Sequence, residues 1–317
     1  MLVIDIGALH ARDAADFDRA TAPMIDPITR ITVLPLWTGP VQPMLLPGGL
    51  GNQSYIVEDS GQKYVVRLGR DFPLLHVYRS WELMASQAAF KAGFSSEIVY
   101  TGPGVFVGIF IDGRNCTPED VRNSTDQIVP MLRRYHHEMT PHIHGAAHMF
   151  WPFHVVRDYA RTLRDERHRN AHMLADFVEV STELERAQAA LPIVFGHNDL
   201  VHRNIVHDGR RVWFVDQEHS GFTTSACDLA GLMSHSSFAD DLIDHALRLY
   251  YGADLTEDIS RSFDAAFAIM PLREALWGML AETHLDIPQV DYVDYGTRKL
   301  EVYRQALGRF RTRWGRP

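Results

Sequence analysis

The spacing of apolar residues changes near Asp112 and Gly113. Before this point, short apolar runs alternate with turn-forming residues, and after it apolar residues recur at the spacing of α-helices. The first part predicts strands at residues 41–46, 54–57, 64–68, 96–100 and 105–111, with one helix at 77–91. The pattern therefore predicts an α+β protein with a small β-rich N-lobe and a larger, mainly helical C-lobe.

The sequence after Gly113 predicts six helices, and one group of short strands interrupts them. The helices are expected at residues 118–137, 153–170, 173–190, 239–251, 257–282 and 292–313, and the strands at 192–195, 205–207 and 212–215. Residues 1–40 are expected to form a flank with a short helix. We therefore expect a flank over residues 1–40, an N-lobe over 41–112 and a C-lobe over 113–317.

Composition limits the classes of function. The chain has 317 residues, two cysteines and a formal net charge of −9. Two cysteines build no disulfide framework, and an acidic chain is a poor binder of nucleic acid. The first residues lack the pattern of a signal peptide, and no apolar run is long enough to span a bilayer. We expect a cytoplasmic protein with a small-molecule partner, no nucleic acid and no membrane; the oligomeric state is left open.

Polar residues gather where the predicted strands interrupt the helices. His197, Asp199 and Asn204 have the spacing His-x-Asp followed by Asn five residues after the Asp, and Asp216 ends the next apolar run. This is the spacing of a kinase catalytic loop followed by a metal-binding Asp. The alternative is a β-hairpin with polar turn residues.

Phosphoryl transfer explains why these residue types are needed. Asp199 would accept the proton of the acceptor hydroxyl, and His197 would brace the loop. Asn204 and Asp216 would hold Mg²⁺, which prefers oxygen ligands, while ATP supplies the phosphoryl group. The sequence therefore predicts an ATP- and Mg²⁺-dependent transfer to a hydroxyl.

The segment from His197 to Asn204, with Asp216-Gln217-Glu218, resembles the choline/ethanolamine kinase family. That family lies within the aminoglycoside phosphotransferase-like small-molecule kinases, which have a protein-kinase-like fold. The resemblance extends over about residues 41–310 and is most specific in the catalytic segment. It implies a two-lobed kinase with ATP in the cleft between the lobes.

The resemblance also implies residues that bind the nucleotide. A glycine-rich turn would cover the phosphates, a basic residue on the third strand would contact them, and its ion-pair partner would lie on the next helix. A hinge would hold adenine through its backbone. The corresponding residues are Gly48, Gly49 and Asn52, then Arg67 and Glu82, then Phe110 and Ile111. Alone, the turn also fits an ordinary hairpin, and Arg67 with Glu82 fits a surface ion pair.

For the acceptor, the resemblance implies an aromatic residue at Trp277, which by helical spacing also fits the core. His235 stands where choline kinases carry an acidic residue, and Leu280 stands where a second aromatic is frequent. A histidine there would titrate near neutrality and repel a cationic head when protonated, unless it only packs behind the pocket. Glu218, Asp240 and Asp241 are the candidate replacements for the missing carboxylate.

Five histidines between residues 136 and 148 could suggest a zinc site. Their spacing matches no zinc motif, and Pro141 and Gly145 favour a loop. We expect a solvated loop.

The function expected from the resemblance is phosphorylation of choline, ethanolamine or a related amino alcohol. The alternatives are an aminoglycoside- or thiamine-type phosphotransferase, or a catalytically silent nucleotide-binding module. The identity of the acceptor is not fixed by sequence.

Overall fold

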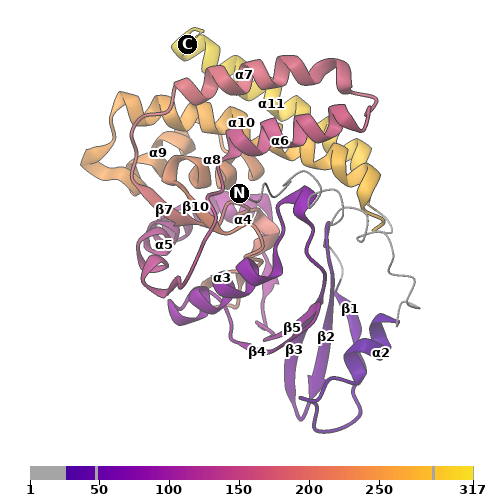
Figure 1. Ribbon diagram of the computed structural model, residues 1–317. Coiled ribbons are helices and arrows are strands. Elements are labelled where there is room, and N and C mark those ends of the chain that lie inside the picture. Colours follow the sequence, from indigo (N-terminus) through magenta and orange to yellow (C-terminus); the bar gives the residue numbers. More distant parts are fainter. Residues whose placement is uncertain (1–25, 47–48, 288–289, 317) are drawn as a thin grey trace, which may run out of the picture.

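The computed structural model describes residues 26–46, 49–287 and 290–316, and it has two lobes (Figure 1). The N-lobe is an antiparallel sheet with the strand order β1-β2-β3-β5-β4. Its strands are β1 (Met44–Leu46), β2 (Gln53–Asp59), β3 (Gln62–Leu68), β4 (Ile98–Gly102) and β5 (Val105–Ile109). Helix α3 (Arg79–Lys91) follows β3 and lies between the sheet and the larger lobe (Figure 1). The predicted α+β class is therefore confirmed.

The short helix predicted in the flank is present as α2 (Pro27–Thr32). Asp26 caps it, because its carboxylate accepts the backbone N–H of Thr29 at 3.0 Å. Ile31 is fully buried against the sheet residues Val57, Val66 and Val107. The described part of the flank therefore packs on the N-lobe, while the rest of residues 1–40 lies outside the described ranges.

The C-lobe is mainly helical, with two small sheets below the helices. Strands β6, β8 and β9 form one sheet, and β7 pairs with β10 in the other. The strands are β6 (Arg114–Asn115), β7 (Ile193–Gly196), β8 (Ile205–His207), β9 (Val212–Phe214) and β10 (Gly221–Thr224). The helices are α4 (Pro118–Asn123), α5 (Thr125–Glu138), α6 (Pro152–Asp165), α7 (Leu174–Arg186), α8 (Ser225–His235), α9 (Asp240–Tyr251), α10 (Glu257–His284) and α11 (Tyr292–Trp314). Single 3-10 turns lie at Pro73–Leu75, Thr140–His142, Ala171–Met173, His202–Asn204 and Gly252–Asp254.

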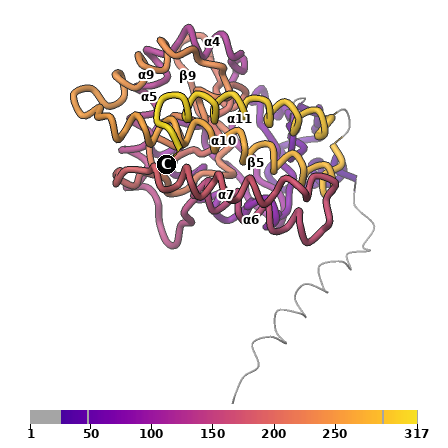
Figure 2. Tube along the Cα trace, turned by 90° about the horizontal axis from the view of Figure 1, so that it is seen from above, coloured from indigo at the N-terminus to yellow at the C-terminus, as the bar shows by residue number. Residues whose placement is uncertain are grey.

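Helix α10 organises the C-lobe core. It packs against α6, α7, α8 and α11, and the helices α6, α7, α10 and α11 lie side by side on the face remote from the sheet (Figures 1 and 2). Its middle part is buried on all sides, including the charged residues Asp264, Arg273 and Glu274. Buried charges need partners, so these three side chains are expected to form ion pairs or hydrogen bonds inside the core.

Two elements differ from the expected pattern. The helix predicted at 118–137 is two helices, α4 and α5, which meet at Ser124; a capping box between Thr117 and Asp120 starts the first. Helix α8 shows no apolar period because ten of its eleven residues are buried. A helix buried on every side has no polar face to reveal it in the sequence.

None of the helices in the described ranges is long and apolar enough to cross a bilayer.

Candidate active site

A cleft of about 940 Å³ separates the two lobes. It is lined by the sheet and α3 on one side and by the 197–219 segment with α8, α10 and α11 on the other. The predicted site residues that line it are Gly49, Asn52, Arg67, Glu82, Phe110, Ile111, Asp199, Asn204, Asp216, Glu218, His235 and Trp277. His197 lies behind the loop, and Gly48 lies outside the described residues.

Asp199 and Asn204 meet at the ends of a short loop. The amide of Asn204 donates to the backbone carbonyl of Asp199 at 2.9 Å and to its carboxylate at 3.2 Å. Burial, together with the nearby carboxylate of Glu274, raises the pKa of Asp199 to about 6, while Arg273 opposes the rise. The carboxylate is therefore fixed in place and has a raised proton affinity, as suits a group that receives a proton.

Asp228, at the start of α8, holds this loop from behind. Its carboxylate accepts the backbone N–H groups of His197 and Asn198 at 2.7 and 2.8 Å. It also accepts a 2.8 Å hydrogen bond from the ring of His136. The His197 ring donates to the carbonyl of Val215 at 3.0 Å, so it joins the loop to the strand that leads to Asp216. This geometry matches the bracing expected of His197.

Tight packing enforces the backbone shape here. Asn198 and Asp216 both have positive φ, at 62° and 68°, a conformation that Asn and Asp tolerate better than most residues. A Cβ on Gly196 would lie 2.5 Å from the methyl group of Thr223. The loop is therefore held in one conformation by its neighbours.

Arg273 and Glu274, which were not predicted as site residues, lie directly behind Asp199. The Arg273 guanidinium is buried, donates to the carbonyl of Asn198 at 3.1 Å and lies 3.6 Å from the carboxylate of Asp199. It also pairs with Glu274 at 2.7 Å. The available sequence signal was two adjacent charges in an otherwise apolar stretch of helix.

The opposite end of the cleft gathers three carboxylates around Arg67. One guanidinium nitrogen lies 2.6 Å from Glu82, 2.5 Å from Asp216 and 3.7 Å from Glu218. The predicted pairing of Arg67 with Glu82 is therefore present. Burial would raise the pKa of Asp216, but Arg67 lowers it to about 2. Burial and the charge of Asp216 raise the pKa of Glu218 to about 8.

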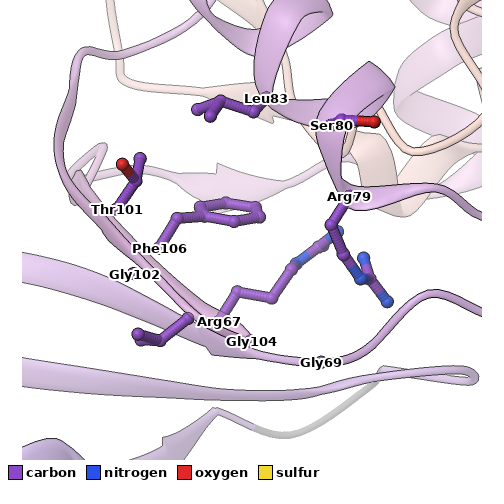
Figure 3. A pocket seen from close by; sticks show the side chains of 10 residues that line it. Arg67, Gly69, Arg79, Ser80, Leu83, Thr101, Gly102, Gly104 and Phe106 are labelled. Carbon is purple, nitrogen blue, oxygen red and sulfur yellow. The ribbon is translucent and has the colours of Figure 1, made fainter.

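Arg79, at the start of α3, extends this group. It pairs with Glu82, lies 3.3 Å from Glu218 and donates to the side-chain oxygen of Asn52. Figure 3 shows the side chains of Arg67 and Arg79 converging beside a smaller cavity of about 230 Å³, near Phe106. Glu218 also accepts a 2.6 Å hydrogen bond from Asn52. Glu218 therefore lies among the nucleotide-side residues, which does not favour its expected role at the acceptor.

The donor set at this end fits a divalent cation. Oxygens of Glu82, Asp216 and Glu218 lie within 4.8 Å of one another. These three side chains offer carboxylate oxygens, the ligands that suit Mg²⁺.

The glycine-rich turn bridges the two ends of the cleft. A Cβ on Gly49 would lie 2.4 Å from the carbonyl oxygen of Asn52, so only glycine fits the turn. The carbonyl of Leu50 accepts a 2.7 Å hydrogen bond from the hydroxyl of Tyr292 on α11, and a Cβ on Gly51 would lie 4.0 Å from the ring of Trp277. We call the contacts of Leu50 with Tyr292 and of Asn52 with Glu218 the clasp.

Aromatic residues and His235 lie at the end of the cleft that is predicted to bind the acceptor, which we call the acceptor end. Trp277 has edge contacts with Tyr292 and Tyr295, with ring centroids 6.0 and 5.6 Å apart. Burial and the neighbouring ammonium of Lys299 lower the pKa of His235 well below its ordinary value. The expectation that His235 titrates near neutrality and repels a cation is therefore wrong, because burial beside Lys299 keeps the ring neutral.

A carboxylate from another helix, Glu274 of α10, lies close to His235. Asp240 pairs with Arg309 at the surface, and neither Asp240 nor Asp241 lines the cleft. Glu274 does line it, and ligand atoms of Glu274, His235 and Asp199 lie within 4.8 Å of one another.

The five histidines do not gather into one cluster. The expected solvated loop is wrong for His136, which is buried in α5 and hydrogen-bonded to Asp228 and Tyr250. His142 ends a 3-10 turn, and His144 lies in the loop that follows. His148 stacks on Trp81 with ring centroids 4.3 Å apart. Among the described residues, the two groups that could hold a metal are Glu82 with Asp216 and Glu218, and Asp199 with His235 and Glu274.

The fold and the site define a phosphotransferase with a protein-kinase-like fold. Choline kinase LicA from Streptococcus pneumoniae shares this fold with a TM-score of 0.72, at 19% identity over 96% of this chain and 99% of that chain. The sequence model of the choline/ethanolamine kinase family matches residues 44–246. The chain belongs to the choline/ethanolamine kinase family, whose kinases use ATP with Mg²⁺.

The curated relatives are distant. Protein LicA of Haemophilus influenzae is 24% identical over 64% of this chain, and the match spans 61% of LicA's own length. Probable ethanolamine kinase A of Dictyostelium discoideum is 23% identical over 84% of this chain and 85% of that protein.

Proposed function

We propose that this protein transfers the γ-phosphoryl group of ATP to the hydroxyl of an amino alcohol such as choline or ethanolamine. The observation that carries the proposal is the convergence of Asp199, Asn204 and Asp216 on one cleft, with a buried carboxylate at each end. The family membership and the kinase names of its relatives support the same reaction.

Asp199 acts as the proton acceptor in this proposal. The acceptor oxygen forms a bond to the γ-phosphorus, the bond from that phosphorus to the β,γ-bridging oxygen breaks, and ADP leaves. The hydroxyl proton passes to the carboxylate of Asp199, whose raised proton affinity suits that task. Arg273 keeps Asp199 and the loop carbonyl of Asn198 in position.

The nucleotide end holds the metal and the phosphates. Asn204 and Asp216 would bind Mg²⁺, and Glu82 and Glu218 supply further oxygens close to Asp216. The ion neutralises phosphate charge when bound. Arg67 would contact the phosphates, Gly49 to Asn52 would cover them, and the backbone at Phe110 and Ile111 would hold adenine.

The acceptor end suits an ammonium group. Glu274 offers a carboxylate, and Trp277 offers a ring face that attracts cations. Glu274 and Trp277 both lie on α10, and Glu274 lies close to Asp199. A short amino alcohol could therefore reach Glu274 with its ammonium and Asp199 with its hydroxyl from one position.

The test is a measurement of ADP release by the purified full chain with ATP and MgCl₂, with choline and ethanolamine as acceptors. Thiamine and kanamycin serve as acceptors of the alternative classes. Acceptor-dependent ADP release and a phosphorylated amino alcohol detected by mass spectrometry are the expected results. Turnover of thiamine or kanamycin alone would refute the amino alcohol and leave a phosphotransferase of another class.

A further inference from the structure

A polar atom at the acceptor end has no hydrogen-bond partner in the described part of the chain. It is the Nε2 atom of His235, which is buried. Glu274 lies close to it, but Oε1 of Glu274 is 2.7 Å from Arg273, and its other carboxylate oxygen accepts a hydrogen bond from the hydroxyl of Tyr295. Buried polar atoms are nearly always paired, so an unpaired donor in a cleft indicates a ligand that supplies its partner.

The tautomer of His235 follows from its neighbour. The ammonium of Lys299 lies 2.8 Å from Nδ1, and an ammonium only donates, so Nδ1 is the acceptor. In the neutral ring the proton is then on Nε2. His235 therefore presents a donor, not an acceptor, to its surroundings.

Lys299 adds a positive charge at the same place. It lines the cleft, and its ammonium lies 5.4 Å from the ring centroid of Tyr295. In residues 26–46, 49–287 and 290–316, no carboxylate lies at ion-pair distance from it, although Glu274 and Asp199 act on it from farther away. Arg203 and Arg298 line the same end of the cleft.

The acceptor end therefore carries both signs of charge. Glu274 presents a carboxylate, which also pairs with Arg273, whereas His235 and Lys299 present an N–H donor and an ammonium. An acceptor with only an ammonium group would satisfy the first and would be repelled by the second. An acceptor that also has a carboxylate would satisfy both.

We propose that the preferred acceptor is a zwitterion: a hydroxylated amine that also carries a carboxylate, bound by the His235–Lys299 pair. This inference rests on the proposed function, since it names the acceptor class of the same transfer step. The hydroxyl faces Asp199, the ammonium faces Glu274, and the carboxylate faces His235 and Lys299. The separation of at most 4.8 Å between ligand atoms of Asp199, His235 and Glu274 suits a compact molecule.

The test compares acceptors that differ only in the carboxylate. The pairs are L-serine with ethanolamine, L-homoserine with 3-aminopropan-1-ol, and L-carnitine with β-methylcholine. ADP release by the full chain gives kcat/KM for each. We expect the carboxylated member of at least one pair to be used about tenfold better or more, the gain expected of a well-placed ionic contact.

Lys299→Met tests the assignment within the protein. It should remove most of that preference by raising KM for the carboxylated acceptor and not for its partner without the carboxylate, whose ammonium Lys299 repels. Lys91→Met, on the exposed end of α3, is the matched control and should leave the preference unchanged. Lys299→Arg, which keeps the charge, should retain part of the preference, and thermal denaturation checks that each variant folds.

The outcomes separate the two proposals. Turnover of the simple amino alcohols with no gain from a carboxylate in any pair overturns the zwitterion and leaves the proposed function standing. An equal effect of Lys299→Met on both members of a pair also overturns it. No turnover of any member of the pairs or of choline, by a protein that binds ATP, overturns the proposed function and the zwitterion together.

Discussion

Replacement of Asp228 by asparagine tests whether a buried carboxylate holds the catalytic loop. In the wild-type protein the carboxylate accepts three hydrogen bonds, two from backbone amides and one from His136. Hydrogen bonds to a charged group contribute about 1.5–3 kcal/mol each. Asparagine keeps the shape but has one acceptor oxygen, so one backbone N–H must face an NH₂ group.

We therefore expect Asp228→Asn to lower the free energy of unfolding by about 3 kcal/mol, which corresponds to a fall in Tm of about 5 °C in a protein of this size. Turnover should fall about 10- to 100-fold, because the loop that carries Asp199 is no longer fixed in position. KM for ATP should change little, since Asp228 lies behind the loop. Thermal denaturation and ADP release measure both effects.

The pH dependence gives a second check. Burial would raise the pKa of Asp228, but the hydrogen bond from His136 and the backbone amides hold it below its ordinary value. A depressed pKa stabilises the protein above the pKa of the unfolded chain, and that contribution is lost as the pH falls. The stability difference between wild type and Asp228→Asn should be full at neutral pH and narrow below about pH 4.

Asp264→Asn is the matched control. Asp264 is equally buried in α10, but it pairs with Arg309 and Arg313 on α11, remote from the loop. It should lower Tm without lowering turnover. The reasoning is refuted if Asp228→Asn keeps wild-type Tm and turnover, or if Asp264→Asn lowers turnover as much.

Three further results are expected. Asp199→Asn should lower turnover by about two to four orders of magnitude with little change in ATP affinity, because the proton acceptor is lost. The exposed control Asp241→Asn should retain activity. Near-normal turnover of Asp199→Asn would contradict the assignment. Asp216→Ala should weaken Mg²⁺-dependent ATP binding measured by calorimetry, and an unchanged Mg²⁺ titration would remove Asp216 from the ligands. In NMR spectra, the ring signals of His235 should not shift between pH 7.5 and about pH 6, because its pKa lies well below the ordinary value of about 6.5. The signals are assigned by their loss in His235→Gln. A titration midpoint in that pH interval would contradict a neutral ring.

The loop that carries Asp199 and Asn204 was predictable because the sequence pattern that indicates it is local. Asp199 and Asn204 are five residues apart, and the strands that flank the loop have the apolar runs expected of strands. The short distance between them in the structure follows from one turn of chain. The two-lobed fold was predictable for a similar reason, because the change of apolar period marks the passage between lobes.

The acceptor end was less predictable because it depends on packing between distant segments. His235 and Lys299 are 64 residues apart and meet only where α8 and α11 converge. The sequence shows that His235 stands where choline kinases carry an acidic residue, but the neutral state of its ring depends on burial and on the ammonium of Lys299. Glu274 was missed because position alone does not tell whether a charge on a buried helix faces the cleft or the core. Which carboxylate lies at which end of the cleft is therefore decided by tertiary structure, as the position of Glu218 beside Arg67 also shows.

The clasp has a consequence for the end of the catalytic cycle. The glycine-rich turn, which in the proposed function covers the nucleotide, is hydrogen-bonded through Leu50 to Tyr292, and its Gly51 lies near Trp277 at the acceptor end. In the proposed reaction, a turn that lifted to free ADP would break the hydrogen bond to Tyr292 and move Gly51 away from Trp277 at the same time. We therefore expect ADP and the phosphorylated acceptor to leave in the same step. When phosphoryl transfer is fast, the rate constant of that release step limits turnover.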